Sequence, residues 1–239
     1  MEPVDIERFV SAGYFLIRAG NPGWDQLKTD LLPENLLSLA NCISEKLNVG
    51  WGWNPGDKPS ALQFGICEEM LDEFVEWCQH DYESELGVWS MFNSPEAANR
   101  FAAHFLVNFE NLHLIGVGLP KGLEEKNWRE EPTEGQMICG IEKRIEQRLP
   151  LAKGGAPLGF EVISFEYGSF GHSWLCNYLH YEIYKLFGIR TGQYGLLQKE
   201  ADARQIYEWI EEDDMQGRRA EPVPYDYWLL VDYPLSTDQ

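Results

Sequence analysis

The sequence predicts an α+β fold of two related helix–strand–helix–strand halves, packed as one body. Three observations lead to this prediction. Apolar residues recur at helical spacing in several segments. Short apolar runs bounded by turn residues alternate with those segments and are typical of strands. Two stretches of the chain also resemble each other, which indicates a tandem duplication.

The two similar stretches carry the same features in the same order. Each has a short apolar run, a helix beginning Glu-Ala-x-x-Arg and an apolar strand followed by proline. In the first stretch these are Gly87–Phe92, Glu96–Arg100 and Leu112–Leu119 with Pro120; in the second they are Gly192–Leu197, Glu200–Arg204 and Tyr227–Tyr233 with Pro234. A long helix is expected before each stretch, entered through Phe64-Gly65 and through Phe170-Gly171.

Individual elements follow from hydrophobic periodicity. Helices are predicted over residues 34–47, 67–78, 97–105, 140–148, 172–187 and 203–210, with Ser94 as the N-cap of the third. The helix at 172–187 is apolar on all faces, which is typical of a buried helix. Strands are predicted over residues 13–18, 88–92, 112–117, 160–167 and 227–233. Partial alternation in the strand at 160–167 predicts one solvated face.

The organisation along the chain follows from these elements. Residues 1–120 form the N-terminal half with the first repeat. Residues 121–156 form a charged, Gly/Pro-containing connector with a short helix. Residues 157–239 form the C-terminal half with the second repeat.

The net charge of the chain indicates which classes of partner to expect. The chain has 39 acidic and 19 basic residues, a net charge of −20 and a pI of about 4.5. Phosphate backbones and anionic lipid headgroups repel such a protein, so we expect neither nucleic acid nor membrane as a partner. A cationic partner would be attracted.

The sequence also predicts a cytoplasmic protein. The first 20 residues begin with acidic side chains and lack the basic region of a signal peptide. No apolar run reaches the roughly 18 residues that a spanning helix needs. The five cysteines are scattered and form no C-x-x-C pair, so reduced thiols are expected.

A search for catalytic chemistry predicts no catalytic residue, metal or cofactor. The sequence contains neither a phosphate-binding loop nor a Gly-x-Ser-x-Gly elbow. His172, Cys176 and His180 would align on a helix face, but the outer two would lie about 12 Å apart along the axis, too far to share one ion. A Cys–His dyad or a carboxylate pair assembled from distant segments stays open, and with it an uncharacterised hydrolase.

The positive signal is a pair of acidic clusters. In the first, carboxylates follow one another at i+4 steps without a basic residue between them, opposite the apolar stripe of the helix. Like charges at this spacing destabilise a helix, as do acids at a helix C-terminus, where the second cluster lies. The predicted partner-binding residues are Glu68, Glu69, Asp72, Glu73, Glu76, Asp81, Glu208, Glu211, Glu212 and Asp213.

These clusters have two interpretations. One is solubility alone, and the other is an electrostatic docking face for a basic protein, with nearby aromatic side chains as anchors. Trp77, Trp128 and Trp209 lie near the acidic stretches, although Trp77 and Trp209 also fit core positions.

Part of the second half resembles small bacterial immunity proteins, which are encoded beside polymorphic toxins. The resemblance covers residues 157–236 and rests on Phe165–Gly171, His172–Asn177, Glu200–Arg204 and Tyr227–Pro234. It implies a non-enzymatic cytoplasmic inhibitor that binds a basic toxin domain and occludes its active site. The alternatives are an acidic DNA mimic that inhibits a nucleic-acid enzyme, or the hydrolase named above.

Overall fold

The fold centres on the pairing of β5 (Leu112–Pro120) with β8 (Tyr225–Tyr233). The computed structural model describes residues 3–52, 54–80, 86–87, 91–125, 140–166, 168–213 and 216–236. Both strands are almost entirely buried, which explains their continuous apolar sequences. Since each strand comes from a different half of the chain, their pairing joins the halves in one sheet.

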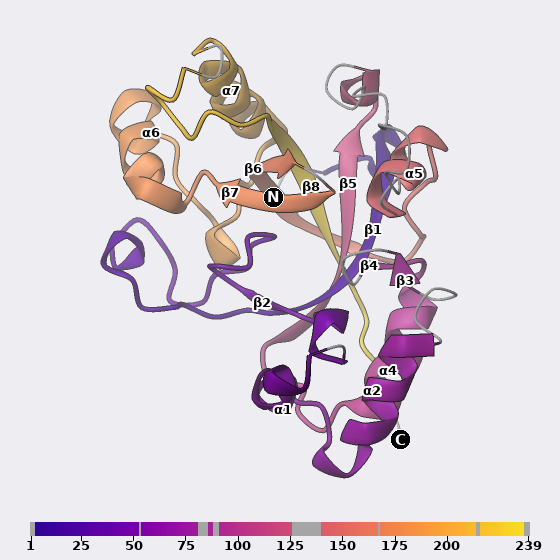
Figure 1. The fold of residues 1–239 in the computed structure, drawn as a ribbon. Helices are drawn as coiled ribbons and strands as arrows, with labels where there is room; N and C mark the ends of the chain where they lie inside the picture. Colours follow the sequence, from indigo (N-terminus) through magenta and orange to yellow (C-terminus); the bar gives the residue numbers. More distant parts are fainter. Residues whose placement is uncertain are drawn as a thin grey trace.

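The remaining strands extend this antiparallel sheet to both sides (Figure 1). Its order is β3-β4-β1-β5-β8-β6-β7, and β2 also pairs with β1. The bounds are Phe9–Arg18 for β1, Glu45–Lys46 for β2, Leu86–Gly87 for β3, Met91–Phe92 for β4, Ala156–Glu166 for β6 and Ser169–Ser173 for β7. The expected mixture of helices and strands is therefore confirmed, and the sheet is antiparallel.

The two halves of the sheet share a pattern of connections. In each half the first strand pairs with the last, β1 with β5 and β6 with β8. Helix α4 (Pro95–Phe105) packs against β1 and β5, as α7 (Glu200–Glu211) packs against β6 and β8. The segment just before each helix also bridges the first strand, at Tyr14↔Phe92 and Phe160↔Leu197.

A glycine bulge precedes each of these bridges. The register of β1 shifts between Ser11 and Gly13, and that of β6 shifts between Pro157 and Gly159. Gly13 has a φ of +111°, and a Cβ there would lie 1.9 Å from the Met91 sulfur. The bulge therefore requires glycine at this position.

The helices show the amphipathic burial that their periodicity predicted. The turn at Glu68–Met70 and α2 (Leu71–His80) match the helix expected at 67–78. Helices α4 and α7 match those expected at 97–105 and 203–210, and the Ser94 hydroxyl accepts a hydrogen bond from the Ala97 N–H as the predicted N-cap. The others are α1 (Lys58–Phe64), α5 (Gly140–Glu146) and α6 (Leu179–Phe187).

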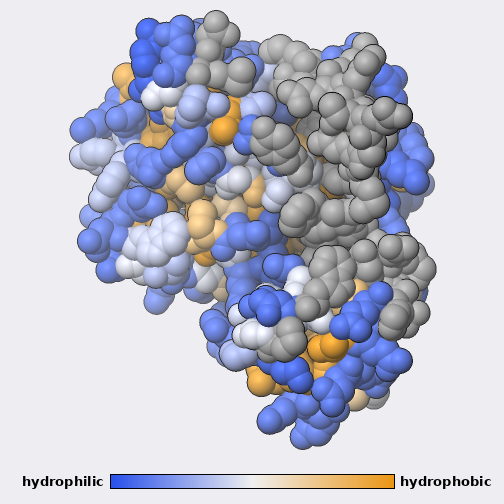
Figure 2. Space-filling model, in the orientation of Figure 1, coloured by the Kyte–Doolittle hydropathy of each residue, from blue (hydrophilic) through white to orange (hydrophobic). Residues whose placement is uncertain are grey.

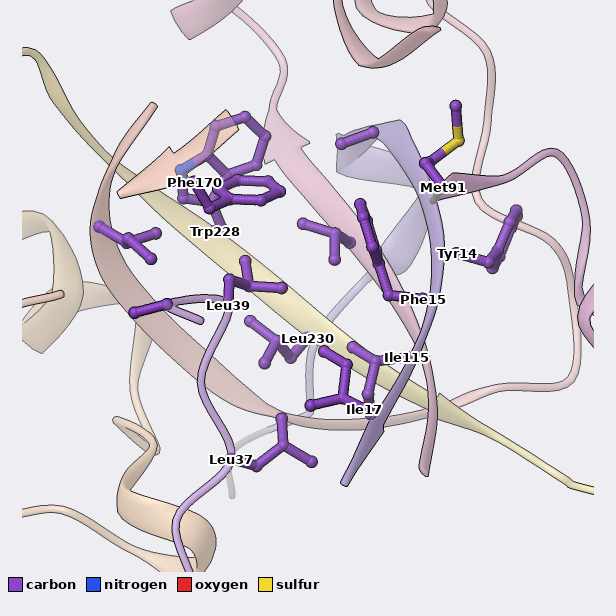
Figure 3. Close-up of a cluster of buried hydrophobic side chains, with 14 of the residues drawn as sticks. Tyr14, Phe15, Ile17, Leu37, Leu39, Met91, Ile115, Phe170, Trp228 and Leu230 are labelled. Carbon is purple, nitrogen blue, oxygen red and sulfur yellow. The ribbon is translucent and has the colours of Figure 1, made fainter. Parts of the chain in front are cut away.

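The helix expected at 34–47 is wrong. This segment is mostly non-helical and lies over the sheet, where Leu37 and Leu39 pack near Ile17, Ile115 and Leu230 (Figure 3). Serine side chains take the place of helical hydrogen bonds, because Ser44 Oγ accepts from the Ser38 N–H and donates to the Leu36 carbonyl.

The helix expected at 172–187 is also too long. Residues up to Ser173 pair with β6 as strand β7, and Asn177 and Tyr178 adopt positive φ values of 52° and 62° before α6 begins. The two segments expected to lead into long helices, Phe64-Gly65 and Phe170-Gly171, therefore have different structures. Gly65 ends α1, whereas Phe170-Gly171 lies inside β7.

The strand expectations hold with shifted ends. Those at 13–18, 112–117, 160–167 and 227–233 correspond to β1, β5, β6 and β8. The strand at 88–92 is represented by β4, since residues 88–90 lie outside the described part.

We predict that Gly13→Ala lowers the free energy of unfolding by about 3 kcal/mol, because the methyl group meets Met91 and the backbone has a positive φ. Urea denaturation measures the change. Gly20→Ala is the matched control, since nothing lies within 4 Å of a Cβ there and its φ is outside the positive range. Equal stabilities for the two variants would contradict this role of the bulge.

Candidate docking surface

The first acidic cluster forms an exposed row along Glu68–Met70 and α2. The opposite side of α2 is buried through Leu71, Phe74 and Cys78. The exposed row consists of Glu68, Glu69, Asp72, Glu73 and Glu76. The sixth carboxylate predicted for this cluster, Asp81, lies outside the described residues. The row therefore combines a fixed helical scaffold with freely accessible charge.

Two basic side chains partly balance the acidic row. Lys58 lies 3.4 Å from Asp72, and His104 lies 2.7 Å from Glu73. All four side chains are exposed, so these ion pairs contribute little to stability. A hydrogen bond from the Cys67 thiol lowers the pKa of Glu69, which keeps that carboxylate ionised.

Exposed apolar side chains lie beside the start of the acidic row. Val107 is 64% exposed, and its N–H donates to the Gly65 carbonyl, three residues before Glu68. Leu62 on α1 is 38% exposed and also precedes Gly65 in the chain. In Figure 2 the lower part of the molecule, over α1 and α2, shows hydrophobic residues among mostly hydrophilic ones.

The tryptophans proposed as anchors do not form this apolar patch. Trp77 is half-buried, with its ring centroid 4.9 Å from that of Phe101. Trp209 is half-buried against Phe187, 6.1 Å away between ring centroids. Trp128 lies outside the described residues. The core interpretation fits Trp77 and Trp209 better than a docking role.

The second acidic cluster, at the end of α7, is less accessible. Glu208 is exposed and Glu211 is half-buried. Glu212 is exposed but forms an ion pair with Arg219 at 3.1 Å. Asp213 is only 3% exposed and accepts hydrogen bonds from the Arg218 side chain and from the backbone N–H groups of residues 218 and 219. Asp213 therefore has a structural role, and its expected place on a docking face is wrong.

The polar site that the sequence did not reveal is centred on Glu161 in β6. Its side chain is fully buried, so the solvated face expected for this strand is wrong. The Ser38 hydroxyl donates to it, as do the Leu39 N–H at 2.8 Å and the Ser173 hydroxyl at 2.7 Å. Burial raises the pKa of Glu161, and these hydrogen bonds oppose that effect.

Lys46 is the cation whose charge acts on the Glu161 carboxylate. Burial lowers the pKa of Lys46 to about 8, and the charge of Glu161 opposes that shift. The ammonium donates to the Leu39 carbonyl and lies 5.8 and 5.5 Å from the ring centroids of Phe15 and Phe170. Glu161 and Lys46 together hold the segment around Ser38 and Leu39 against the sheet.

A cleft elsewhere in the protein is lined by paired charges. A cavity of about 580 Å³ is lined by charged side chains from the turn before β1, from the residues just after β5 and from α7. Within it Glu200 pairs with Arg8 at 3.1 Å and with Arg204 at 3.3 Å, and the Tyr227 hydroxyl is 3.4 Å from the same carboxylate. Its opposite charges neutralise each other, and its lining includes neither cysteine nor histidine.

The His172, Cys176 and His180 set is also not a metal site. The three residues belong to β7, to a short turn at Cys176–Tyr178 and to α6, so they do not share a helix face. Within the described ranges, no group of three or more potential ligands could hold a metal ion. No helix there is both long and apolar enough to cross a membrane.

Comparison with known proteins gives no relative. No family model matches the chain, and no curated protein or solved structure is significantly similar to it.

We predict that Glu161→Leu lowers the free energy of unfolding by about 3 kcal/mol or more, because it leaves the Leu39 N–H and two hydroxyls without their acceptor. Glu161→Gln is the control, since its amide oxygen can accept from Leu39 while its NH₂ donates to the serines, at a cost of about 1 kcal/mol. Urea denaturation of both variants tests this. A leucine variant as stable as the glutamine variant would contradict the role given to these hydrogen bonds.

Proposed function

We propose that the protein is an acidic cytoplasmic inhibitor, of the immunity-protein kind, that binds a basic toxin domain and occludes its active site. The observation that carries this proposal is the exposed acidic row at Glu68–Glu76 with exposed Leu62 and Val107 beside it. Charge and accessible apolar surface together are what a specific protein interface needs. No catalytic role is required of any residue.

The acidic row would act mainly on the rate of association. A net charge of −20 attracts a basic partner from a distance, and the local row orients it. The carboxylates at i+4 spacing repel one another in the free protein, and a basic partner would relieve this repulsion. This cost in the free state is a physical reason to assign the row a binding role.

The apolar side chains would supply binding energy after contact. Removing Leu62 and Val107 from water stabilises the complex and slows dissociation, because interface energy concentrates in a few buried apolar residues. Charge and apolar surface therefore control different rate constants.

We also propose that the two halves arose by tandem duplication. The support is their shared pattern: a first strand with a glycine bulge at Gly13 or Gly159, a bridge to the segment before a helix, and a last strand at the centre of the sheet. The acidic row belongs to an insertion in the first half, between β2 and β4. On this proposal the insertion supplies the specific interface.

A partner is first isolated with the full chain as bait. The triple substitution of Glu69, Glu73 and Glu76 to lysine should slow association with this partner by about tenfold or more at low salt and flatten its salt dependence. Stopped-flow or surface-based kinetics at several salt concentrations measures this. The fold should persist, because the buried side of α2 is unchanged.

The matched control is the triple substitution of Glu34, Glu146 and Glu182 to lysine. These exposed residues lie on other segments, and the change in net charge is the same. If the control slows association as much as the first variant, net charge alone matters and the acidic row is not the docking face.

The double substitution Leu62→Ser and Val107→Ser should speed dissociation by about tenfold and leave the association rate nearly unchanged. Leu186→Ser is the control, because Leu186 is 58% exposed on α6, away from the acidic row. Equal dissociation rates for the double variant and the wild type would exclude this apolar patch from the interface.

A further inference from the structure

A second cavity lies where the curvature of the sheet brings two distant strands together. Strands β1 and β7 are separated by β5, β8 and β6, so a flat sheet would hold them about 19 Å apart. The ring centroids of Phe15 on β1 and Phe170 on β7 are nevertheless only 5.9 Å apart. A cavity of about 270 Å³ lies at this junction, at the lower end of the volumes usual for small-molecule sites.

This cavity has an apolar floor and a polar mouth. The floor consists of the buried side chains of Phe15, Phe170 and Ile141, which come from β1, β7 and α5. Both phenylalanines belong to the buried cluster of Figure 3. The mouth includes the exposed side chains of Asn41 and Asn48. A concave apolar surface with a few polar groups is typical of a site for a small organic molecule.

Lys46 supplies hydrogen-bond donors to this cavity. Its ammonium lies 5.8 and 5.5 Å from the ring centroids of Phe15 and Phe170, so it is next to the apolar floor. It donates to the Leu39 carbonyl, but an ammonium has three N–H groups and can donate to a ligand as well. The pKa of Lys46, which burial lowers to about 8 against the charge of Glu161, agrees with this apolar setting.

We propose that this cavity binds a neutral, planar aromatic molecule that carries a carbonyl group. Its ring packs against Phe15 and Phe170, and its carbonyl oxygen accepts a hydrogen bond from Lys46. The ligand is neutral because Glu45 also lines the cavity and Glu161 already acts on Lys46, so a second carboxylate would be repelled. Lys46 would repel a cation. The lining includes no residue of the acidic row, so this site does not depend on the proposed docking function.

Ligand-observed NMR titration of the full chain tests the proposal, with benzamide as the probe. Benzamide should bind saturably. Benzene lacks the carbonyl and benzoate is charged, so each should bind at least about tenfold more weakly. Benzene binding as tightly as benzamide would contradict the hydrogen bond, and benzoate doing so would contradict the neutral class. Absence of saturable benzamide binding would overturn the proposal as a whole.

The role of Lys46 is tested by Lys46→Met, which removes the donor and keeps a long apolar side chain. This variant should bind benzamide about tenfold more weakly than the wild type, with an affinity close to that for benzene. Lys28→Met is the matched control, because Lys28 is exposed and pairs with Asp25 on another segment. Equal benzamide affinities for the two variants would exclude Lys46 from the site.

A second variant tests the position of the site without removing the contact of Lys46 with the Leu39 carbonyl. Asn41→Trp places a large side chain at the exposed mouth and should weaken benzamide binding by at least about tenfold. Asn35→Trp is the control, since Asn35 is exposed on the same segment and does not line the cavity. Unchanged binding in Asn41→Trp would show that benzamide binds elsewhere.

Reductive labelling with benzaldehyde, a member of the proposed ligand class, locates the site directly. The Lys46 amine attacks the aldehyde carbon, and water leaves as the C=N bond forms. Cyanoborohydride then transfers hydride to the imine carbon while the nitrogen takes a proton, which leaves a benzyl group that peptide mapping detects.

Near neutral pH, Lys46 should be labelled at least about tenfold faster than the exposed Lys28, because the cavity holds the aldehyde beside an amine whose pKa is about 8. Excess benzamide should slow labelling of Lys46 and leave that of Lys28 unchanged. Equal labelling of the two lysines, or labelling of Lys46 that benzamide does not slow, would overturn the proposal.

Discussion

The pairing of β5 with β8 is the constraint on which the rest of the structure depends. The two strands come from different halves of the chain and pair in a continuous register from Leu114↔Tyr233 to Gly118↔Leu229. Each is covered on both sides, so neither can remain folded without the elements that pack on it. The pairing therefore makes the folding of each half depend on the other and places β1 and β6, the first strand of each half, on either side of a shared centre.

The buried carboxylate of Glu161 helps to hold the segment that follows β1 against the sheet. The segment after β1 has little helix or strand of its own, and the hydrogen bonds to Glu161 help to hold it in place, together with the backbone bridge between Gly20 and Leu36. A buried ionised group is costly unless it is fully hydrogen-bonded, and here three donors and the Lys46 charge meet that requirement.

Sequence patterns predicted the elements whose burial is one-sided or continuous. The apolar stripe from Leu71 to Cys78 gave α2 because its polar side faces solvent, and the uninterrupted run in β8 gave a strand because both its faces are covered. The acidic row could be predicted for the same reason, since its accessibility follows from the helical period. Asp213 could not be distinguished from its exposed neighbours in this way. It is buried, and the Arg218 side chain donates a hydrogen bond to it.

Contacts between distant segments were beyond prediction from the sequence. Ser38 and Glu161 are separated by 123 residues, and an acidic residue inside an apolar strand has the same alternation whether solvent or a buried donor faces it. The helix wrongly expected at 34–47 has the same cause. Leu36, Leu37 and Leu39 have helical spacing, but the segment that carries them is not helical and buries them against the sheet. Glu161 in the middle of β6 was the one available signal of a buried polar site.

Hydrogen–deuterium exchange of the chain, alone and with its captured partner, tests the central claim most directly. The partner is first isolated with the full chain as bait, eluted with salt and purified to a one-to-one complex. The account predicts a basic protein whose binding slows exchange at residues 62–76 and 105–108, around the acidic row and the apolar patch. Protection confined to other surfaces, with these two segments exchanging as in the free chain, would contradict it.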